Sequence, residues 1–189
     1  MSKKVLIING ATREGGNTDT LLSKLSDGME SSGLQVIEVR LRDLNISDCI
    51  GCCQCLKEKS CHFEDDMTNL RKSLIATDVI VFASPIYWCE VTGLMKTFVD
   101  RLYFFHHQVN RDMISGKKAL ILTTLGEKEA SYESEVLVEF YRRFLGSLGI
   151  EIIDMLFFAD LMEKDAIKSR PGYLDRAYTA GKRLSTISD

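Results

Sequence analysis

The sequence lacks several features that would each indicate a particular class of protein. No apolar run reaches the length of a membrane span, and the first one, residues 5–8 (VLII), is only long enough for a buried strand. We therefore expect neither a membrane segment nor an export signal, and we predict a cytoplasmic protein. Thiols are kept reduced there, and clustered cysteines more often bind metal or act in redox chemistry than form structural disulfides.

The chain also has no marked excess of charge of one sign, and few prolines interrupt its alternation of apolar and polar segments. Its 24 Lys and Arg residues and 27 Asp and Glu residues give a net charge of −3. No basic stripe stands out, so we expect no binding of nucleic acid or of a membrane surface. Only two prolines are present, with no internal repeat, linker or low-complexity segment. Residues 1–189 are therefore predicted to form one domain.

What the sequence does contain is a regular alternation of apolar runs and amphipathic segments. At least three runs are continuously apolar, which is typical of a parallel sheet covered on both faces, whereas residues 35–41 alternate and indicate a strand near an edge. Asp66 is expected to cap the second helix. The pattern predicts an α/β fold, a flavodoxin-like three-layer sandwich whose five-stranded parallel sheet has the order 2-1-3-4-5. The predicted strands are residues 4–8, 35–41, 78–84, 117–124 and 150–159, and the predicted helices are residues 18–32, 67–76, 94–105, 133–148 and 173–187.

The loop after the first strand, residues 9–20 (NGATREGGNTDT), has the composition of an anion-binding turn. Small residues let backbone N–H groups approach an anion, and the following helix adds positive charge at its N-terminus. The loop matches neither the triphosphate-binding pattern nor the dinucleotide fingerprint G-x-G-x-x-G. Its hydroxyls and amides at Thr12, Asn17 and Thr18, with one cation at Arg13, suit a single phosphate monoester. The alternative is an ordinary turn in which Asn17 or Thr18 only caps the helix.

The loop after the third strand, residues 84–93 (SPIYWCEVTG), carries Tyr87 and the only tryptophan, Trp88. Flat apolar side chains held by a proline turn can flank an aromatic ligand, and nearby backbone N–H groups can bond its polar edge. The alternative is a hydrophobic loop that packs on its neighbour or on a partner subunit. Ligands of open α/β sheets bind beyond the carboxyl ends of the strands, so both loops should meet. Together they favour a planar ring with a phosphorylated tail, such as FMN.

Three segments carry a resemblance to a known family: NGATREGGNT (residues 9–18), ASPIYWCEVTGLMKTFVDR (83–101) and LTTLGE (122–127). With them the chain resembles the NAD(P)H-dependent FMN reductase branch of the flavodoxin-like superfamily. The resemblance implies an oxidoreductase that binds FMN and uses NAD(P)H as co-substrate. The electron acceptor would be a quinone, a flavin, another small molecule or a redox protein. The resemblance also implies a homodimer or tetramer. The flavin supplies the chemistry, so no catalytic side chain is nominated. The implied FMN-binding residues are Thr12, Arg13, Gly15, Asn17 and Thr18 for the phosphate, Pro85, Ile86, Tyr87 and Trp88 for the ring, and Thr123 and Gly126 near its far side.

Five of the six cysteines lie within residues 48–61 (DCIGCCQCLKEKSC). The spacing of Cys49, Cys52, Cys55 and Cys61 can wrap one cubane cluster, while Cys53 lies between them and is expected to point elsewhere. This spacing resembles that of the iron–sulfur flavoproteins, which implies an electron carrier with FMN and a [4Fe–4S] cluster. Three alternatives stay open: a zinc site, reduced thiols or a disulfide that only shape the loop, and a flavin-binding sensor whose thiols respond to oxidant.

Overall fold

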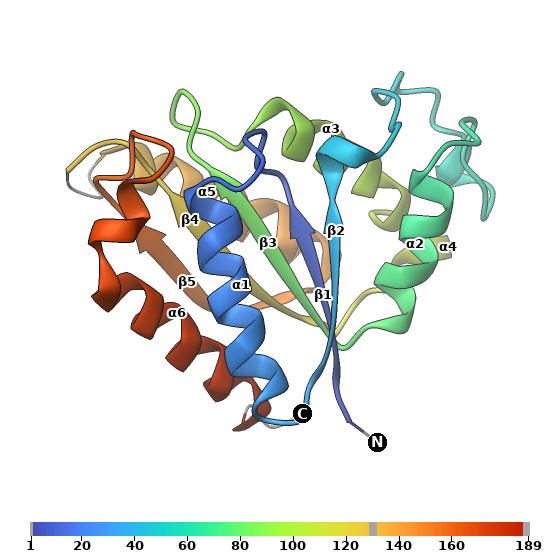
Figure 1. The fold of residues 1–189 in the computed structure, drawn as a ribbon. Helices are drawn as coiled ribbons and strands as arrows, with labels where there is room; N and C mark the ends of the chain where they lie inside the picture. Colours follow the sequence, from blue (N-terminus) through green and yellow to red (C-terminus); the bar gives the residue numbers. More distant parts are fainter. Residues whose placement is uncertain (1, 129–131, 187–189) are drawn as a thin grey trace.

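The computed structural model describes residues 2–128 and 132–186 of the chain. Its centre is a sheet of five parallel strands in the order β2-β1-β3-β4-β5 (Figure 1). The fold class and the strand order predicted from the sequence are confirmed. The strands are β1 (Lys4–Asn9), β2 (Gln35–Arg40), β3 (Val79–Pro85), β4 (Lys118–Thr124) and β5 (Glu151–Phe158).

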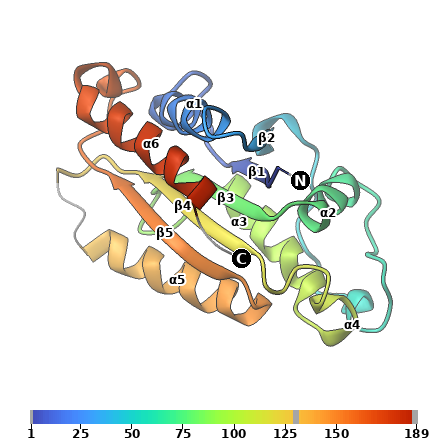
Figure 2. The same cartoon turned by 90° about the horizontal axis from the view of Figure 1, so that it is seen from below.

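Helices cover both faces of the sheet (Figure 2). Alternate residues of β1 enter opposite cores: Val5 and Ile7 pack towards the first helical layer, and Leu6 and Ile8 pack towards the second. Burial on both sides explains why this strand is continuously apolar rather than alternating. The first layer holds α1 (Asn17–Glu30) and α6 (Pro171–Arg183), and the second holds α2 (Met67–Ala76), α3 (Gly93–Arg101) and α5 (Tyr132–Leu148), with the short α4 (Gln108–Arg111) beside it.

In the first layer, α1 and α6 approach each other more closely than side chains would permit. A Cβ on Gly28 would overlap the backbone carbonyl oxygen of Tyr178, and a Cβ on Gly181 would overlap the carbonyl oxygen of Leu25. The two glycines therefore allow direct contact between the helix backbones. This contact helps to fix α1, whose first turn borders the site described below.

Some predicted helix ends differ from those observed. The helix predicted to reach residue 105 ends as an α-helix at Arg101, and the chain continues as a 3-10 turn, Leu102–Phe105. The last helix begins at Pro171 rather than at residue 173, since proline fits the first turn of a helix. Asp66 lies at the N-cap position of α2, but its carboxylate accepts the N–H of Asn45 at 2.7 Å instead of capping the helix. The predicted side-chain cap is therefore wrong.

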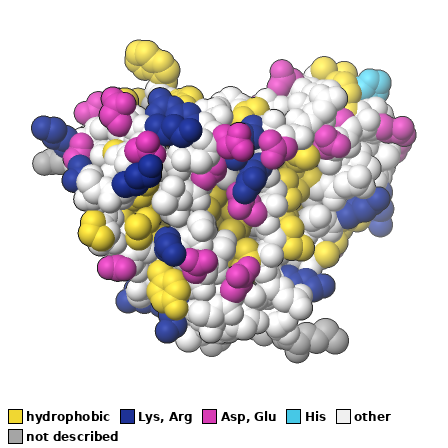
Figure 3. Space-filling view, viewed as in Figure 1, with side chains coloured by type: hydrophobic (Ala, Val, Ile, Leu, Met, Phe, Trp, Pro, Cys, Tyr) yellow, Lys and Arg dark blue, Asp and Glu magenta, His cyan; other side chains and the backbone are white. Residues whose placement is uncertain are grey.

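The surface mixes charges of both signs. Figure 3 shows Lys and Arg side chains interspersed with Asp and Glu side chains over the face seen in Figure 1. This face therefore presents no extended field of one sign. Within the described ranges, no helix is both long and apolar enough to cross a membrane.

Candidate functional site

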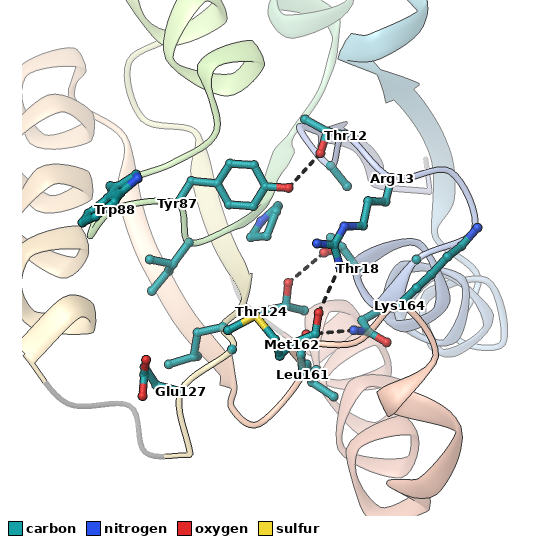
Figure 4. A pocket seen from close by; sticks show the side chains of 17 residues that line it. Thr12, Arg13, Thr18, Tyr87, Trp88, Thr124, Glu127, Leu161, Met162 and Lys164 are labelled. Carbon is teal, nitrogen blue, oxygen red and sulfur yellow. Dashed lines mark hydrogen bonds between the residues drawn. The ribbon is translucent and has the colours of Figure 1, made fainter.

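A cavity of about 560 Å³ opens at the carboxyl ends of the strands (Figure 4). Four loops line it: residues from 11–18 after β1, residues 85–88 after β3, residues 124–127 where β4 ends, and residues from 161–164 after β5. Its volume lies within the roughly 300–1,000 Å³ that is typical of small-ligand pockets. The first two loops are the ones that the sequence predicts to meet at this edge of the sheet, and the third contains Gly126, which the resemblance places near the ring.

The N-terminus of α1 borders the cavity without a side-chain cap. Gly16 holds the N-cap position, and among residues 2–128 and 132–186 no side-chain cap of the first turn is found there. The first backbone N–H groups of an α-helix have no helical partner. Those of Asn17 and Thr18, which both line the cavity, are thus left for a ligand, and the helix dipole adds positive charge. This helix end suits an anion such as phosphate.

Two threonines of the first loop face partners from other loops. Thr12 Oγ1 lies 2.9 Å from the hydroxyl oxygen of Tyr87, and Thr18 Oγ1 lies 2.9 Å from Thr124 Oγ1 (Figure 4). In each pair either oxygen can donate the hydrogen bond. The structure therefore brings the predicted residues Thr12, Thr18 and Tyr87 together around one space.

Asn17 has a structural role that the sequence did not indicate. Its Nδ2 donates to the carbonyl oxygens of Leu161 and Glu163 at 3.0 and 2.7 Å, and its Oδ1 accepts the N–H of Ile167 at 3.1 Å. The buried side chain thus ties the start of α1 to the segment after β5. Since its amide is used within the protein, its backbone N–H is the group that remains for a ligand.

Two of the predicted binding residues, Gly15 and Thr123, are not among the residues that line the cavity. Gly15 has a φ of 61°, and its N–H donates to Asp19 Oδ2 at 2.8 Å. Thr123 is fully buried in β4, and its neighbour Thr124 lines the cavity instead, because successive strand residues point to opposite faces. Gly126 does line the cavity.

All four predicted residues of the 85–88 loop line the cavity. Pro85 has no N–H, and the N–H groups of Ile86 and Tyr87 each donate to backbone carbonyl oxygens at 2.8 Å. This leaves Trp88 as the residue of this loop whose N–H is available to a ligand, as far as the described chain shows. Trp88 has a φ of 50°, and its side chain is 97% exposed at the rim. Its indole is therefore almost entirely in contact with solvent.

The fourth loop is absent from the site predicted from the sequence. It contributes Leu161, Met162 and Lys164 to the wall, and Arg13 Nη1 donates to the carbonyl oxygen of Met162 at 3.0 Å. Lys164 thus adds a second cation to the one expected at Arg13. The predicted strand order could have indicated this loop. Because β5 lies beside β4 and runs parallel to it, the loop after β5 reaches the same edge of the sheet.

Behind the first loop, Asp19 joins a network of largely buried polar groups. Its carboxylate accepts hydrogen bonds from Gly15 N at 2.8 Å, from Asn9 Nδ2 at 2.7 Å and from Arg42 Nη2 at 3.0 Å. Burial alone would raise the pKa of the Asp19 carboxyl, but the hydrogen bonds from Arg42, Asn9 and Gly15 outweigh it and hold the pKa below its usual value of 3.8. The network fixes the turn that opens onto the cavity.

We expect this network to make stability depend on pH through Asp19. Folding lowers the pKa of its carboxyl, so the network's contribution is fully present above the unfolded value of 3.8 and is lost as the pH falls through the lower folded value. In urea unfolding between about pH 5 and pH 3, the wild-type protein should lose more free energy of unfolding than Asp19→Asn does. Equal losses in the two proteins would contradict this role.

The cysteine segment, residues 48–61, lies between β2 and α2 in the chain. In Figure 1 it forms the loop above and to the right of α2. All the cysteines are free thiols: Cys49, Cys52 and Cys53 are exposed, and Cys55 and Cys61 are half-buried. Burial raises the pKa of the Cys55 thiol, and its neighbours Cys61, Cys49 and Cys52 raise it further. In the part of the chain that the structure describes, no three His, Cys, Asp or Glu side chains are already arranged around a metal position.

Buried polar side chains anchor this exposed segment to the body of the protein. Asn110, in α4, is fully buried, and its Nδ2 donates to the carbonyl oxygen of Cys55 at 3.1 Å. Arg101, the last residue of α3, donates through Nη1 to the carbonyl oxygen of Ser47 at 2.7 Å. Buried polar groups are stable only when they are hydrogen bonded, so these contacts give the segment a defined position.

The chain is similar in sequence to a known protein family and to several known proteins. Residues 3–148 match the family described as NADPH-dependent FMN reductase. An iron-sulfur flavoprotein of Archaeoglobus fulgidus is 32% identical over 136 residues, which cover 71% of this chain and 62% of that protein. An iron-sulfur flavoprotein of Clostridioides difficile is 29% identical over 154 residues, covering 78% of this chain and 67% of that protein. The chain thus spans less than two thirds of the length of the first of these relatives.

Solved structures show the same fold. An NAD(P)H:quinone oxidoreductase from Methanothermobacter marburgensis superposes with a TM-score of 0.75 at 19% sequence identity, covering 100% of this chain and 98% of that one. At this identity the likeness shows that the two chains share a fold, and it shows nothing of a shared substrate.

Proposed function

The chain belongs to the NADPH-dependent FMN reductase family, and on that premise we propose that it binds FMN and passes reducing equivalents from NAD(P)H to a small acceptor such as a quinone or a flavin. One observation carries the proposal: the uncapped N-terminus of α1 and the aromatic loop 85–88 open into the same cavity. A helix N-terminus suits a phosphate, and flat apolar side chains suit a ring. The residues that line the cavity therefore fit both ends of FMN.

At the phosphate end, the backbone N–H groups of the first turn of α1 would hold the phosphate oxygens. The hydroxyls of Thr12 and Thr18 lie on the same wall. Since either partner can donate in the hydrogen bond between Thr12 and Tyr87, Thr12 can turn its proton to a phosphate oxygen. Arg13 and Lys164 also line the cavity and supply positive charge for a charge-assisted contact.

At the ring end, Pro85, Ile86 and Tyr87 offer apolar surface, and the N–H of Trp88 can donate to a polar edge. Bound FMN would supply the redox chemistry by accepting hydride from the nicotinamide and passing electrons to the acceptor. The protein's own part is to hold and orient the ring and to keep water from it. We therefore assign binding residues and no catalytic side chain.

Anaerobic purification followed by a turnover assay tests this function. The protein should carry flavin or take it up, and should oxidise NADPH or NADH steadily when a quinone is present. Without the quinone, oxidation should stop after the flavin has been reduced. A protein that binds FMN but oxidises neither nicotinamide would retain the cofactor proposal and contradict the proposed activity.

A second candidate function is that of an electron carrier with FMN and a [4Fe–4S] cluster on Cys49, Cys52, Cys55 and Cys61. The spacing of these four cysteines in the sequence favours it, as do the names of the relatives in Archaeoglobus and Clostridioides. Four thiolates are the donor set of such a cluster. Since no three ligands are arranged for a metal within the described ranges, the exposed segment would have to draw its thiols together around the cluster.

Paired cysteine variants test this second function. After anaerobic purification, Cys55→Ser should lose most of the iron and acid-labile sulfide, whereas Cys53→Ser should keep the wild-type content, since Cys53 lies outside the ligand set. Iron and sulfide analysis with an absorption spectrum measures the difference. Zinc in place of iron would show a zinc site, and absence of both metals with reactive thiols would favour a thiol sensor. Either result would contradict the cluster.

A further inference from the structure

The hydrogen bond between Thr12 and Tyr87 joins the two loops that the proposed function assigns to opposite ends of FMN. Thr12 belongs to the loop after β1, and Tyr87 lies 75 residues further along the chain, in the 85–88 loop. Their hydroxyl oxygens are 2.9 Å apart, and both residues line the cavity. Figure 4 shows the phenol of Tyr87 reaching towards Thr12, with Trp88 on the other side of it. The hydroxyl of Tyr87 thus belongs to the phosphate side of the site, although its backbone belongs to the ring side.

The backbone of Tyr87 is held in place independently of this contact. Its N–H donates to the carbonyl oxygen of Glu90 at 2.8 Å, and its carbonyl oxygen accepts the N–H of Glu90 at 3.2 Å. The N–H of the preceding residue, Ile86, donates to the carbonyl oxygen of Thr124 at 2.8 Å. Groups that are already held in their binding position lose less entropy when a ligand arrives. The phenol is therefore carried by a segment that is fixed on both sides.

Nothing else in the described part of the chain directs the proton of Thr12. Among residues 2–128 and 132–186, the contact between Thr12 and Tyr87 is the one hydrogen bond that either side chain makes. A hydroxyl has one proton to donate and two positions at which it accepts, so this contact can be arranged in two ways. Which of the two oxygens donates decides what Thr12 presents to a ligand.

An anion beside Thr12 selects one of the two arrangements. If Thr12 donates to Tyr87, its only proton is used, and it turns a bare oxygen to the anion. If Tyr87 donates, Thr12 keeps its proton for an oxygen of the anion, which gives a charge-assisted hydrogen bond. Hydrogen bonds in such a chain polarise and strengthen one another. A phosphate at this position is therefore held best when Tyr87 donates to Thr12.

We propose that Tyr87 is a positioning residue for the phosphate of FMN: its hydroxyl donates to Thr12 and so directs the Thr12 proton to a phosphate oxygen. The inference rests on the FMN site proposed above. It gives a second role to a residue that the resemblance assigns to the ring. The preference for FMN over riboflavin, which has the same ring and no phosphate, would then depend in part on a residue of the ring loop.

Tyr87→Phe and Tyr178→Phe form a matched pair for the test. Tyr87→Phe removes the hydroxyl and keeps the aromatic face. Tyr178, on α6, is similarly exposed, at 36% against 41%, and its hydroxyl also contacts another hydroxyl, Ser31 Oγ at 3.3 Å. It is not among the residues that line the cavity. Fluorescence titration of each apoprotein with FMN and with riboflavin gives both affinities, and far-UV circular dichroism confirms that each variant is folded.

In Tyr87→Phe the ratio of FMN affinity to riboflavin affinity should fall about three- to tenfold, which is the usual effect of one lost hydrogen bond. The affinity for riboflavin should stay at the wild-type value, because the ring face is unchanged. Tyr178→Phe should keep both wild-type affinities. Equal weakening of the two flavins in Tyr87→Phe would show that the hydroxyl serves the ring, and unchanged affinities for both would show that it serves neither. Either result would overturn the inference.

Thr12→Val and Thr12→Ser test whether Tyr87 acts through Thr12. Valine resembles threonine in shape but has no hydroxyl, so Tyr87→Phe should weaken FMN binding no further in a Thr12→Val protein. In a Thr12→Ser protein, which keeps the hydroxyl, Tyr87→Phe should have its full effect. The full effect in Thr12→Val as well would overturn the inference and leave the FMN site standing. Absence of FMN binding by the wild-type protein would instead contradict the proposed cofactor, and this inference with it.

Discussion

Thr12→Asp should weaken FMN binding by roughly 100-fold or more, because its carboxylate would repel the phosphate across a short distance. Thr12 lines the cavity, and its Oγ1 lies 2.9 Å from the hydroxyl oxygen of Tyr87. A substitution at Thr12 therefore changes the cavity wall between the loop after β1 and the 85–88 loop. Thr12→Asn has nearly the same size as Thr12→Asp and no charge. It should stay within about tenfold of wild type, the effect of one altered hydrogen bond.

Riboflavin provides the control for this pair, since it has the same ring and no phosphate. The two Thr12 variants should bind riboflavin equally, and only FMN should distinguish them. Fluorescence titration of the apoproteins measures both ligands. Equal FMN affinities for Thr12→Asp and Thr12→Asn would place the phosphate elsewhere and contradict its assignment to the N-terminus of α1.

Gly181→Ala should destabilise the folded protein by about 3 kcal/mol, at the upper end of the usual cost of overpacking. The added Cβ would overlap the carbonyl oxygen of Leu25, and two backbones cannot repack around it as flexible side chains could. For a chain of this size the melting temperature should fall by about 6–12 °C. Urea unfolding and calorimetry measure the change.

Gly146→Ala is the matched control for Gly181→Ala. Gly146 lies in α5, and a Cβ there would meet no atom within 4 Å. This substitution should therefore stabilise the protein by about 0.5–1 kcal/mol, since alanine loses less backbone entropy in a helix than glycine does. A Gly181→Ala protein as stable as Gly146→Ala would show that α1 and α6 are not in direct backbone contact.

The sheet could be predicted from the sequence because its signals are local. The central strands are buried on both faces, and residues 5–8 are accordingly apolar without interruption. Right-handed crossovers between parallel strands then leave few topologies, which is why the strand order was predictable. The loops at the carboxyl edge followed from that order, and Thr12, Thr18 and Tyr87 do meet there.

The rest of the site depends on contacts between residues far apart in the chain. Asn17 has the sequence position of a phosphate ligand, yet its amide is taken up by the segment after β5, which no local pattern indicates. Asp66 has the position of a helix cap but pairs with Asn45. Arg71 resembles any polar residue of an amphipathic helix, yet the fold buries it against the ring of Phe104. Tertiary contacts of this kind override local preference.

Titration of the apoprotein with FMN and with riboflavin, followed by flavin fluorescence, tests the central claim most directly. If the N-terminus of α1 holds the phosphate and the 85–88 loop holds the ring, one FMN should bind per chain. Riboflavin should then bind at least about 100-fold more weakly, because it lacks the charge-assisted contacts. Absence of saturable FMN binding, or equal affinities for the two flavins, would contradict the account.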